Sequence, residues 1–160
     1  MKHSLLFNLV FGIIMYMIPF VASMSCPIPK DYYPKPASQP PDWVFGVVWS
    51  ILYLFVVLNM LILLNSSNID TPIGGFAIFF ALLSFFLNIL WIATWGCTKE
   101  PKTALWIFIA LLFSVGLQMI LSYTINPISG ILIMPLFVWA LYAISLNQRI
   151  VETIDSTLSV

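Results

Sequence analysis

Six tryptophans are the side chains of this chain best suited to bind a molecule, because its ionisable groups are few and scattered. One histidine, His3, and two cysteines, Cys26 and Cys97, cannot complete a zinc site, so no metal is expected. No serine–histidine pair or carboxylate pair can be placed within an apolar run, which disfavours hydrolytic and acid–base catalysis. The six acids all lie between apolar runs or in the tail: Asp31, Asp42, Asp70, Glu100, Glu152 and Asp155.

The charge distribution excludes two further classes of function. No lysine, arginine or histidine lies inside an apolar run, whereas ion pumps and proton-coupled carriers normally need an ionisable group within the membrane. The net charge is zero and there is no basic cluster, so no nucleic-acid partner is expected. No cofactor is required by any of these residues.

The tryptophans divide by their depth in the apolar runs. Three lie within about a turn of one end of a run, where indole favours the headgroup zone: Trp43, Trp95 and Trp106. The other three are deeper, and there an indole N–H needs an acceptor or a bound molecule: Trp49, Trp91 and Trp139. Core packing and ligand contact both remain open for this deeper set, and core packing is the simpler explanation.

The elements that position these residues are membrane spans. The chain is 61% hydrophobic and 8% charged, with a mean hydropathy of +1.04, whereas a soluble domain has about 25% charged residues. Five apolar runs of about 20 residues match the ~30 Å hydrocarbon core, so we expect an all-α, five-helix integral membrane bundle forming one domain, residues 1–160. The expected spans are 4–24, 43–64, 73–96, 103–123 and 128–148. Thr71-Pro72, Glu100-Pro101 and Asn126-Pro127 predict helix starts.

The first run admits a second interpretation. Lys2 precedes the apolar stretch, and Val21-Ala22-Ser23 resembles a cleavage site, so residues 1–23 could be a removed signal peptide. The apolar stretch is longer than the usual core of a signal peptide, which favours a retained span.

The connection 26–42 is the one loop long enough to cover a pocket. It contains six prolines and four charged residues, and its prolines keep the backbone extended. Asp42 is expected to accept hydrogen bonds from the free N–H groups of the following helix. The loop is therefore predicted to be a lid.

The positive charges predict the orientation. Lys2 lies on one side of the membrane, and five cations lie on the other: Lys30, Lys35, Lys99, Lys102 and Arg149. The positive-inside rule places the lid and the C-terminus in the cytoplasm. Cys26 and Cys97 would then face a reducing compartment, so free thiols are expected.

A continuous stripe of mostly small residues runs along the third span. Its members recur every three or four residues: Gly74, Ala77, Ala81, Ser84, Asn88, Trp91 and Trp95. Small residues allow close helix approach in lipid. The stripe could face a neighbouring helix of the same chain, or Ala77 and Ala81 could form a homodimer interface.

Three segments resemble the tryptophan-rich TspO/translocator-protein family. The first is the loop and helix start that carries Lys35-Pro36, Gln39-Pro40-Pro41, Trp43, Trp49 and Leu52-Tyr53. The second is Leu87-Asn88 with Trp91, and the third is the run from Pro135 through Trp139 and Ala143 to Asn147. The overall resemblance covers all five spans, and its specific motifs are confined to these three segments.

The resemblance implies a pocket for porphyrins, such as haem or protoporphyrin IX. Trp49 and Trp139 would stack on the ligand, while Trp91 and Ala143 would shape the cavity. Tyr53, Asn88 and Asn147 would supply hydrogen bonds or hold helices in place. The implied lid residues are Lys35, Pro36, Pro40, Pro41 and Trp43. The family's dimer contact on the third helix favours a homodimer through Ala77 and Ala81.

Three functions remain in competition. The first is a porphyrin-binding receptor or translocator. The second is oxidative or light-driven porphyrin breakdown, for which Trp49 and Trp139 are the candidate catalytic residues. The third is a structural membrane protein without a ligand. A bacterial inner membrane is the expected location, with the outer mitochondrial membrane as the eukaryotic counterpart.

Overall fold

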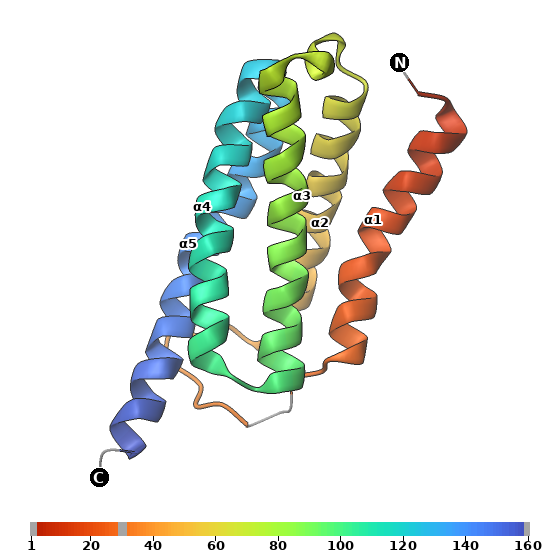
Figure 1. Cartoon of the computed structure of the whole chain (residues 1–160). Helices are drawn as coiled ribbons and strands as arrows, with labels where there is room; N and C mark the ends of the chain where they lie inside the picture. Colours follow the sequence, from red (N-terminus) through yellow and green to blue (C-terminus); the bar gives the residue numbers. More distant parts are fainter. Residues whose placement is uncertain (1–2, 29–31, 159–160) are drawn as a thin grey trace.

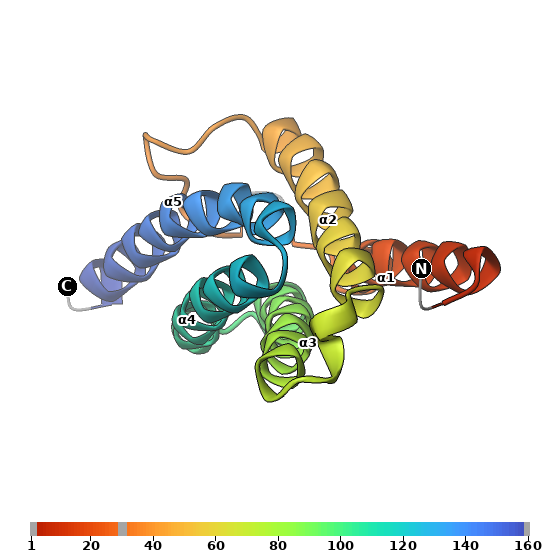
Figure 2. The same ribbon diagram turned by 90° about the horizontal axis from the view of Figure 1, so that it is seen from above.

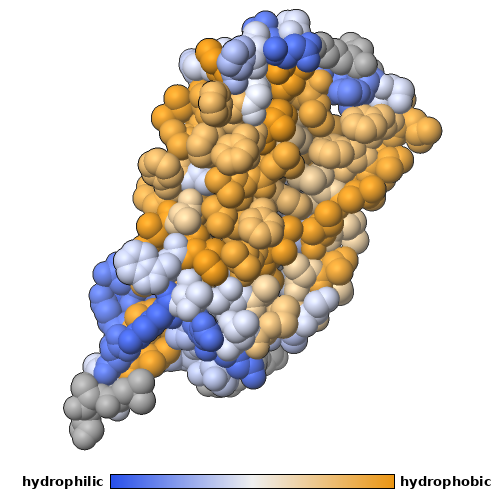
Figure 3. All heavy atoms as spheres, in the orientation of Figure 1, coloured by the Kyte–Doolittle hydropathy of each residue, from blue (hydrophilic) through white to orange (hydrophobic). Residues whose placement is uncertain are grey.

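The computed structural model describes residues 3–28 and 32–158, and within these it is all-helical. Five long helices are joined by short connections (Figure 1): α1 Leu5–Ser25, α2 Asp42–Leu64, α3 Pro72–Ala93, α4 Pro101–Ile125 and α5 Pro127–Leu158. Each is long and apolar enough to cross a membrane, and the surface shows an apolar band between hydrophilic ends (Figure 3). The predicted five-span membrane bundle is confirmed.

Local sequence explains where several helices begin. The Thr71 hydroxyl accepts a hydrogen bond from the Gly74 N–H at 3.1 Å, and Asn126 accepts one from Ile128 N–H at 3.0 Å. Each cap precedes a proline at the first helical position, as expected. The prediction for Asp42 was wrong, because the first turn of α2 has no side-chain cap. Its carboxylate instead accepts from Lys35 and Gln39 in the lid.

Two helix ends differ from the expected spans. A π-helical turn, Thr94–Thr98, follows α3, so the side chains there are offset from the regular helical period. Helix α5 continues to Leu158, ten residues past its expected end at 148. This extension carries charged residues and is held by contacts with the end of α3 and the start of α4: Ile150 packs with Trp95 and Ala104, and Lys102 pairs with Asp155 at 2.8 Å.

Helices α2 to α5 form the body of the bundle, and α1 lies at its edge beside α2 (Figures 1 and 2). α1 contacts α2 and α3. Its buried residues are Asn8, Gly12, Met15 and Pro19, one turn apart along a single narrow face. The rest of α1 is largely exposed towards the region that lipid would occupy.

Uncharged polar side chains connect three helices inside the bundle. Gln118 of α4 donates to the Asn59 side-chain oxygen of α2 at 3.0 Å, and Asn59 donates to the Ser129 hydroxyl of α5 at 2.7 Å. All three residues are at most 1% exposed. Hydrogen bonds between helices help to hold bundles together in lipid, so this triad fixes the register of α2, α4 and α5.

The small-residue stripe of α3 is buried within the single chain. Ala77 and Ala81 are 0% and 1% exposed, and Ala81 packs with Met15 and Met60 from α1 and α2. Ser84 shares a 2.9 Å hydrogen bond with Ser114 of α4. The prediction of a dimer interface on Ala77 and Ala81 was therefore wrong, because neighbouring helices of the same chain cover both residues.

Candidate functional site

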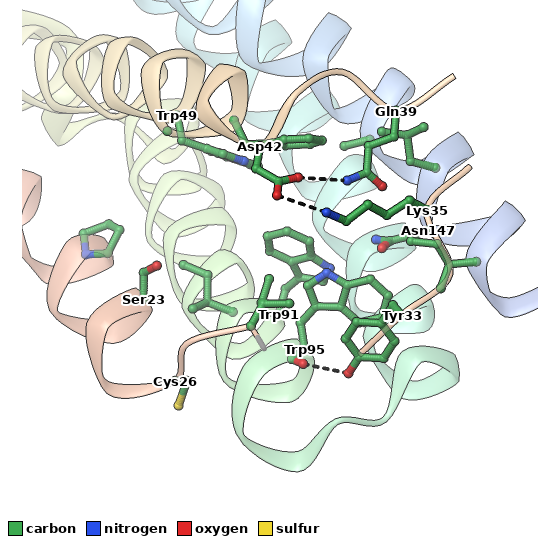
Figure 4. A pocket seen from close by; sticks show the side chains of 18 of the residues that line it. Ser23, Cys26, Tyr33, Lys35, Gln39, Asp42, Trp49, Trp91, Trp95 and Asn147 are labelled. Atoms are coloured by element: carbon green, nitrogen blue, oxygen red, sulfur yellow. Dashed lines mark hydrogen bonds and ion pairs between the residues drawn. The ribbon is translucent and has the colours of Figure 1, made fainter. Parts of the chain in front are cut away.

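A cavity of about 470 Å³ lies at the lid end of the bundle (Figure 4). Its walls come from α1, α2, the end of α3, α5 and the lid. This volume falls within the range of small-molecule sites, roughly 300–1,000 Å³. The lining is predominantly apolar, and its two charged residues are Lys35 and Asp42. The arrangement is that of a binding pocket.

Aromatic rings form a continuous row along the cavity. Trp49 stacks on Tyr53 with ring centroids 5.4 Å apart and lies 6.0 Å from Trp91. The row continues from Trp91 to Trp95 at 6.4 Å and from Trp95 to Tyr33 at 4.4 Å. Such spacings are typical of interacting aromatic pairs. The row offers ring faces and edges to a planar aromatic guest.

Two buried donors in the cavity wall make no hydrogen bond within the described part of the chain. They are the Trp91 indole nitrogen and the Asn147 side-chain nitrogen. Buried polar atoms in folded proteins almost always have a partner. Both residues line the cavity, but these two nitrogen atoms are covered by neighbouring protein atoms, so a guest would reach them only after a local side-chain movement.

Charged groups lie at the mouth of the cavity rather than inside it. The Lys35 ammonium is 3.2 Å from the Asp42 carboxylate, and the Gln39 side-chain nitrogen donates to the same carboxylate at 3.4 Å (Figure 4). The pair is half-exposed, so its contribution to stability is small. It places both signs of charge where a polar edge of a guest would emerge.

The lid is attached to both sides of the cavity. On one side the Tyr33 hydroxyl donates to the Trp95 carbonyl at 2.8 Å, in addition to stacking on its ring. On the other side the Tyr142 hydroxyl of α5 donates to the Ser38 carbonyl at 2.7 Å. Burial, followed by the neighbouring Tyr32, raises the pKa of Tyr33 to about 12. The phenol therefore stays protonated and able to donate at neutral pH.

A disulfide joins Cys26 and Cys97 beside the cavity, with Cα atoms 4.8 Å apart. The expectation of free thiols was wrong in this structure. That expectation considered only the compartment, whereas the close approach of the two chain segments brings the sulfurs together. A Cβ atom at Gly96 would overlap the Cys26 carbonyl oxygen, so glycine is needed at this contact.

A second, water-sized cavity of about 20 Å³ lies behind the first and shares Trp49 and Tyr53 with it. Asn88 and Gln118 border this space. The Tyr53 hydroxyl donates to the Asn88 side-chain oxygen at 3.0 Å. Asn88 thus orients a residue of the main cavity instead of lining it.

Most of the ligand residues suggested by the sequence converge on the main cavity: Trp49, Tyr53, Trp91, Ala143 and Asn147. Trp139 is not among the lining residues of either cavity. Its ring packs edge-on against Phe45, at 5.7 Å, and Phe45 itself lines the cavity. Phe45 therefore occupies the position in which Trp139 was expected.

Of the five lid residues suggested by the sequence, one lines the cavity and four do not. Lys35 lines the cavity, whereas Pro36, Pro40 and Pro41 belong to the loop without lining it, and Trp43 is 69% exposed. Sequence reasoning missed Tyr33 and Trp95. The spacing of Trp91 and Trp95, four residues apart on one helix face, was a signal that could have found Trp95. It also missed α1, which contributes Pro19, Phe20 and Ser23.

Sequence comparisons find a family model and several relatives that match most of this chain. A sequence model described as the TspO/MBR family matches residues 5–152. A "Tryptophan-rich protein TspO" of Chlorobaculum tepidum is 25% identical over 139 residues, covering 84% of this chain and 87% of the relative. A "Tryptophan-rich sensory protein" of Cereibacter sphaeroides is 29% identical over 122 residues, 74% of each chain. A "Tryptophan-rich protein TspO" of Archaeoglobus fulgidus is 31% identical over 121 residues, covering 72% of this chain and 73% of the relative.

Proposed function

This chain belongs to the TspO/MBR family of multi-pass membrane proteins, and on that premise we propose that its main cavity binds porphyrin-type ligands, such as haem or protoporphyrin IX. The observation that carries the proposal is the row of five aromatic rings along a cavity whose two charged lining residues, Lys35 and Asp42, lie at its mouth. A flat, apolar macrocycle can stack against such rings, and its loss of contact with water favours binding.

The polar groups suit the same class of guest. Trp91 and Asn147 line the cavity and carry nitrogen donors without a partner in the described part of the chain, while the charges of Lys35 and Asp42 remain at the mouth. A porphyrin has an apolar ring and two carboxylates at one edge, so its ring would lie among the tryptophans with the carboxylates towards the lid. In this role the protein acts as a receptor or translocator, and the lid controls exchange of the ligand.

Titration of the purified protein with protoporphyrin IX tests the proposal. Saturable changes in the porphyrin absorption band, together with saturable quenching of tryptophan emission, are expected. Linear, non-saturating changes equal to those in empty nanodiscs would contradict it and favour a structural membrane protein. The absorption band is the better readout for variants, because substituting a tryptophan alters the emission itself.

A second candidate function is light-dependent breakdown of the bound porphyrin by dioxygen. The aromatic row favours it, since neighbouring tryptophans and tyrosines can pass an electron between them without any acid or base group. Illumination of the complex in air would then yield a bilin-like product in the wild type and less of it in Trp49→Phe. Recovery of intact porphyrin after illumination would leave binding as the sole function.

A further inference from the structure

Helix α1 is a cavity wall with little packing of its own. Pro19, Phe20 and Ser23 line the cavity, and Phe20 contacts the Tyr53 ring edge-on at 5.7 Å. Figure 4 shows Ser23 and Cys26 on the α1 side of the space, across from Asn147 of α5. Because α1 buries just one narrow face, the free energy that holds it against the bundle is small compared with that of the inner helices.

The lid-side end of α1 is held by a covalent bond. Cys26 follows the last residue of α1, and Cys97 lies in the π-helical turn after α3. The two cysteines are 71 residues apart in the sequence, and the segment between them includes the lid and α2. The disulfide is therefore the strongest tie between the α1 wall and the aromatic wall that carries Trp91 and Trp95.

The bond is open to reagents from the aqueous side. Cys97 is exposed and Cys26 is half-buried, and both lie at the end of the bundle rather than within the apolar band. Exposed disulfides are the labile ones, whereas structural disulfides are usually shielded. Cys97 is therefore the more accessible of the two cysteines for a soluble thiol.

The charges at this end indicate the compartment. Lys35, Lys99, Lys102 and Arg149 all lie at the lid end, which the positive-inside rule assigns to the cytoplasm. The cytoplasm keeps thiols reduced, and the disulfides found there are usually transient and redox-sensing. An exposed disulfide in the cytoplasm is expected to undergo thiol–disulfide exchange with soluble thiols.

We propose that Cys26 and Cys97 form a reversible redox latch that closes the α1 wall of the cavity. In the oxidised state the disulfide holds the end of α1 against the turn after α3. In the reduced state α1 moves away at this end, and the cavity opens sideways between α1 and α3. Only the effect of the latch on a ligand rests on the proposed function, because the movement of α1 itself requires no ligand.

The chemistry is thiol–disulfide exchange with a cellular dithiol. A thiolate of the dithiol attacks the Cys97 sulfur, the bond between the two cysteines breaks, and Cys26 leaves as a thiolate. The second thiolate of the reductant then displaces Cys97 from the mixed disulfide. In total two electrons and two protons pass from the dithiol to Cys26 and Cys97, and the dithiol becomes a disulfide.

Hydrogen–deuterium exchange of the full chain in nanodiscs tests the latch without any ligand. Reduction with dithiothreitol is expected to raise exchange in residues 18–28 by about tenfold or more, because a cross-link of this length strongly restricts opening. The α4 segment serves as the internal control. A Cys26→Ser/Cys97→Ser variant should match the reduced wild type with or without dithiothreitol. Equal exchange in oxidised and reduced wild type would overturn the latch.

Two further measurements separate the latch from the ligand. Dissociation of protoporphyrin IX should be about tenfold faster from the reduced protein and from the double-serine variant than from the oxidised protein. If the porphyrin binds in neither state, the proposed function fails, and the exchange data still decide the latch. In cells, acid trapping and thiol labelling should show both redox forms, shifting with an added oxidant. A fully oxidised pool even after treatment with reductant would make the bond structural and overturn reversibility.

Discussion

Tyr33 lies flat against Trp95, with ring centroids 4.4 Å apart, and its hydroxyl donates to the backbone carbonyl of the same residue. These two residues are 62 positions apart in the chain. The contact joins the lid to the aromatic wall of the cavity. The protonated phenol is therefore one of the groups that hold the lid, beside the Tyr142–Ser38 hydrogen bond and the Lys35–Asp42 ion pair.

The first prediction follows from the pKa of Tyr33, raised from 10.0 to about 12. A raised pKa means that the folded state favours the protonated phenol, so its contribution to stability is complete below pH 10 and is lost as the pH rises through about 12. Near-UV circular dichroism should show the lid loosening in this interval. Tyr33→Phe keeps the ring but not the hydroxyl, and it should lack this transition. An unchanged transition in the variant would contradict the assignment.

Trp49 and Trp139 offer a matched pair of substitutions. Trp49→Phe should weaken protoporphyrin affinity by roughly fivefold, because an indole face next to the ligand is lost, at a cost of about 1 kcal/mol. Trp139→Phe should leave the affinity unchanged, since Trp139 does not line the cavity and packs edge-on against Phe45, which does. Titration followed by porphyrin absorption gives both values. An equal loss in the two variants would mean that the guest reaches Trp139.

Asp42 places a negative charge at the cavity mouth. Asp42→Asn should strengthen binding of protoporphyrin IX by about threefold, because a carboxylate near the ligand's own carboxylates is removed and the Lys35 ammonium is no longer paired with it. The dimethyl ester of the same porphyrin is the control ligand, and its affinity should not change. A similar gain in affinity for the ester would show that the substitution acts by moving the lid and not by removing a charge.

Gly96 and Gly75 differ in the space around them. A Cβ atom at Gly96 would overlap the backbone of Cys26, whereas one at Gly75 meets nothing within 4 Å. Gly96→Ala should therefore destabilise the protein by about 1–3 kcal/mol. Gly75→Ala should be neutral or stabilising, by up to about 1 kcal/mol. Thermal unfolding in detergent compares them, and equal midpoints would show that α1 is not held closely at this contact.

Asn59 connects α2 to α4 and α5 through hydrogen bonds. Asn59→Leu preserves the approximate volume but leaves the Gln118 nitrogen and the Ser129 hydroxyl with fewer partners, so a loss of about 1–2 kcal/mol is expected. Ser50→Ala is the control, since the Ser50 hydroxyl bonds to the Gly46 carbonyl of its own helix. Unfolding in denaturing detergent measures the difference. A neutral Asn59→Leu would make the triad dispensable.

The fold was largely predictable because its signals are local. Apolar length set the spans, and the prolines at 72, 101 and 127 set three helix starts. The extension of α5 was not predictable by hydropathy, since the segment after residue 148 contains Arg149, Glu152 and Asp155. It continues because Ile150 and Ile154 pack near Trp95. This contact depends on where the end of α3 lies.

The site was predictable only in part, because depth and neighbours decide which rings reach the cavity. Trp95 was assigned to the headgroup zone from its position near a span end, yet it is 6% exposed and covered by Tyr33. Trp139 lies on the same helix face as Ala143, but it packs edge-on against Phe45 of α2, and Phe45 lines the cavity in its place. The pairing of Cys26 with Cys97 likewise depends on tertiary structure, because it requires the end of α1 to lie next to the π-helical turn that follows α3.

The spans have an electrical consequence. Their buried polar residues, such as Asn59, Gln118 and Ser129, are neutral amides and hydroxyls, and the formal charges of the described chain lie at the bundle ends or beyond. A membrane potential does about 2.3 kcal/mol of work per 100 mV on each elementary charge that crosses the bilayer. Outward movement of α1 would carry no such charge through the field. Its equilibrium should therefore be the same in energised and de-energised membranes.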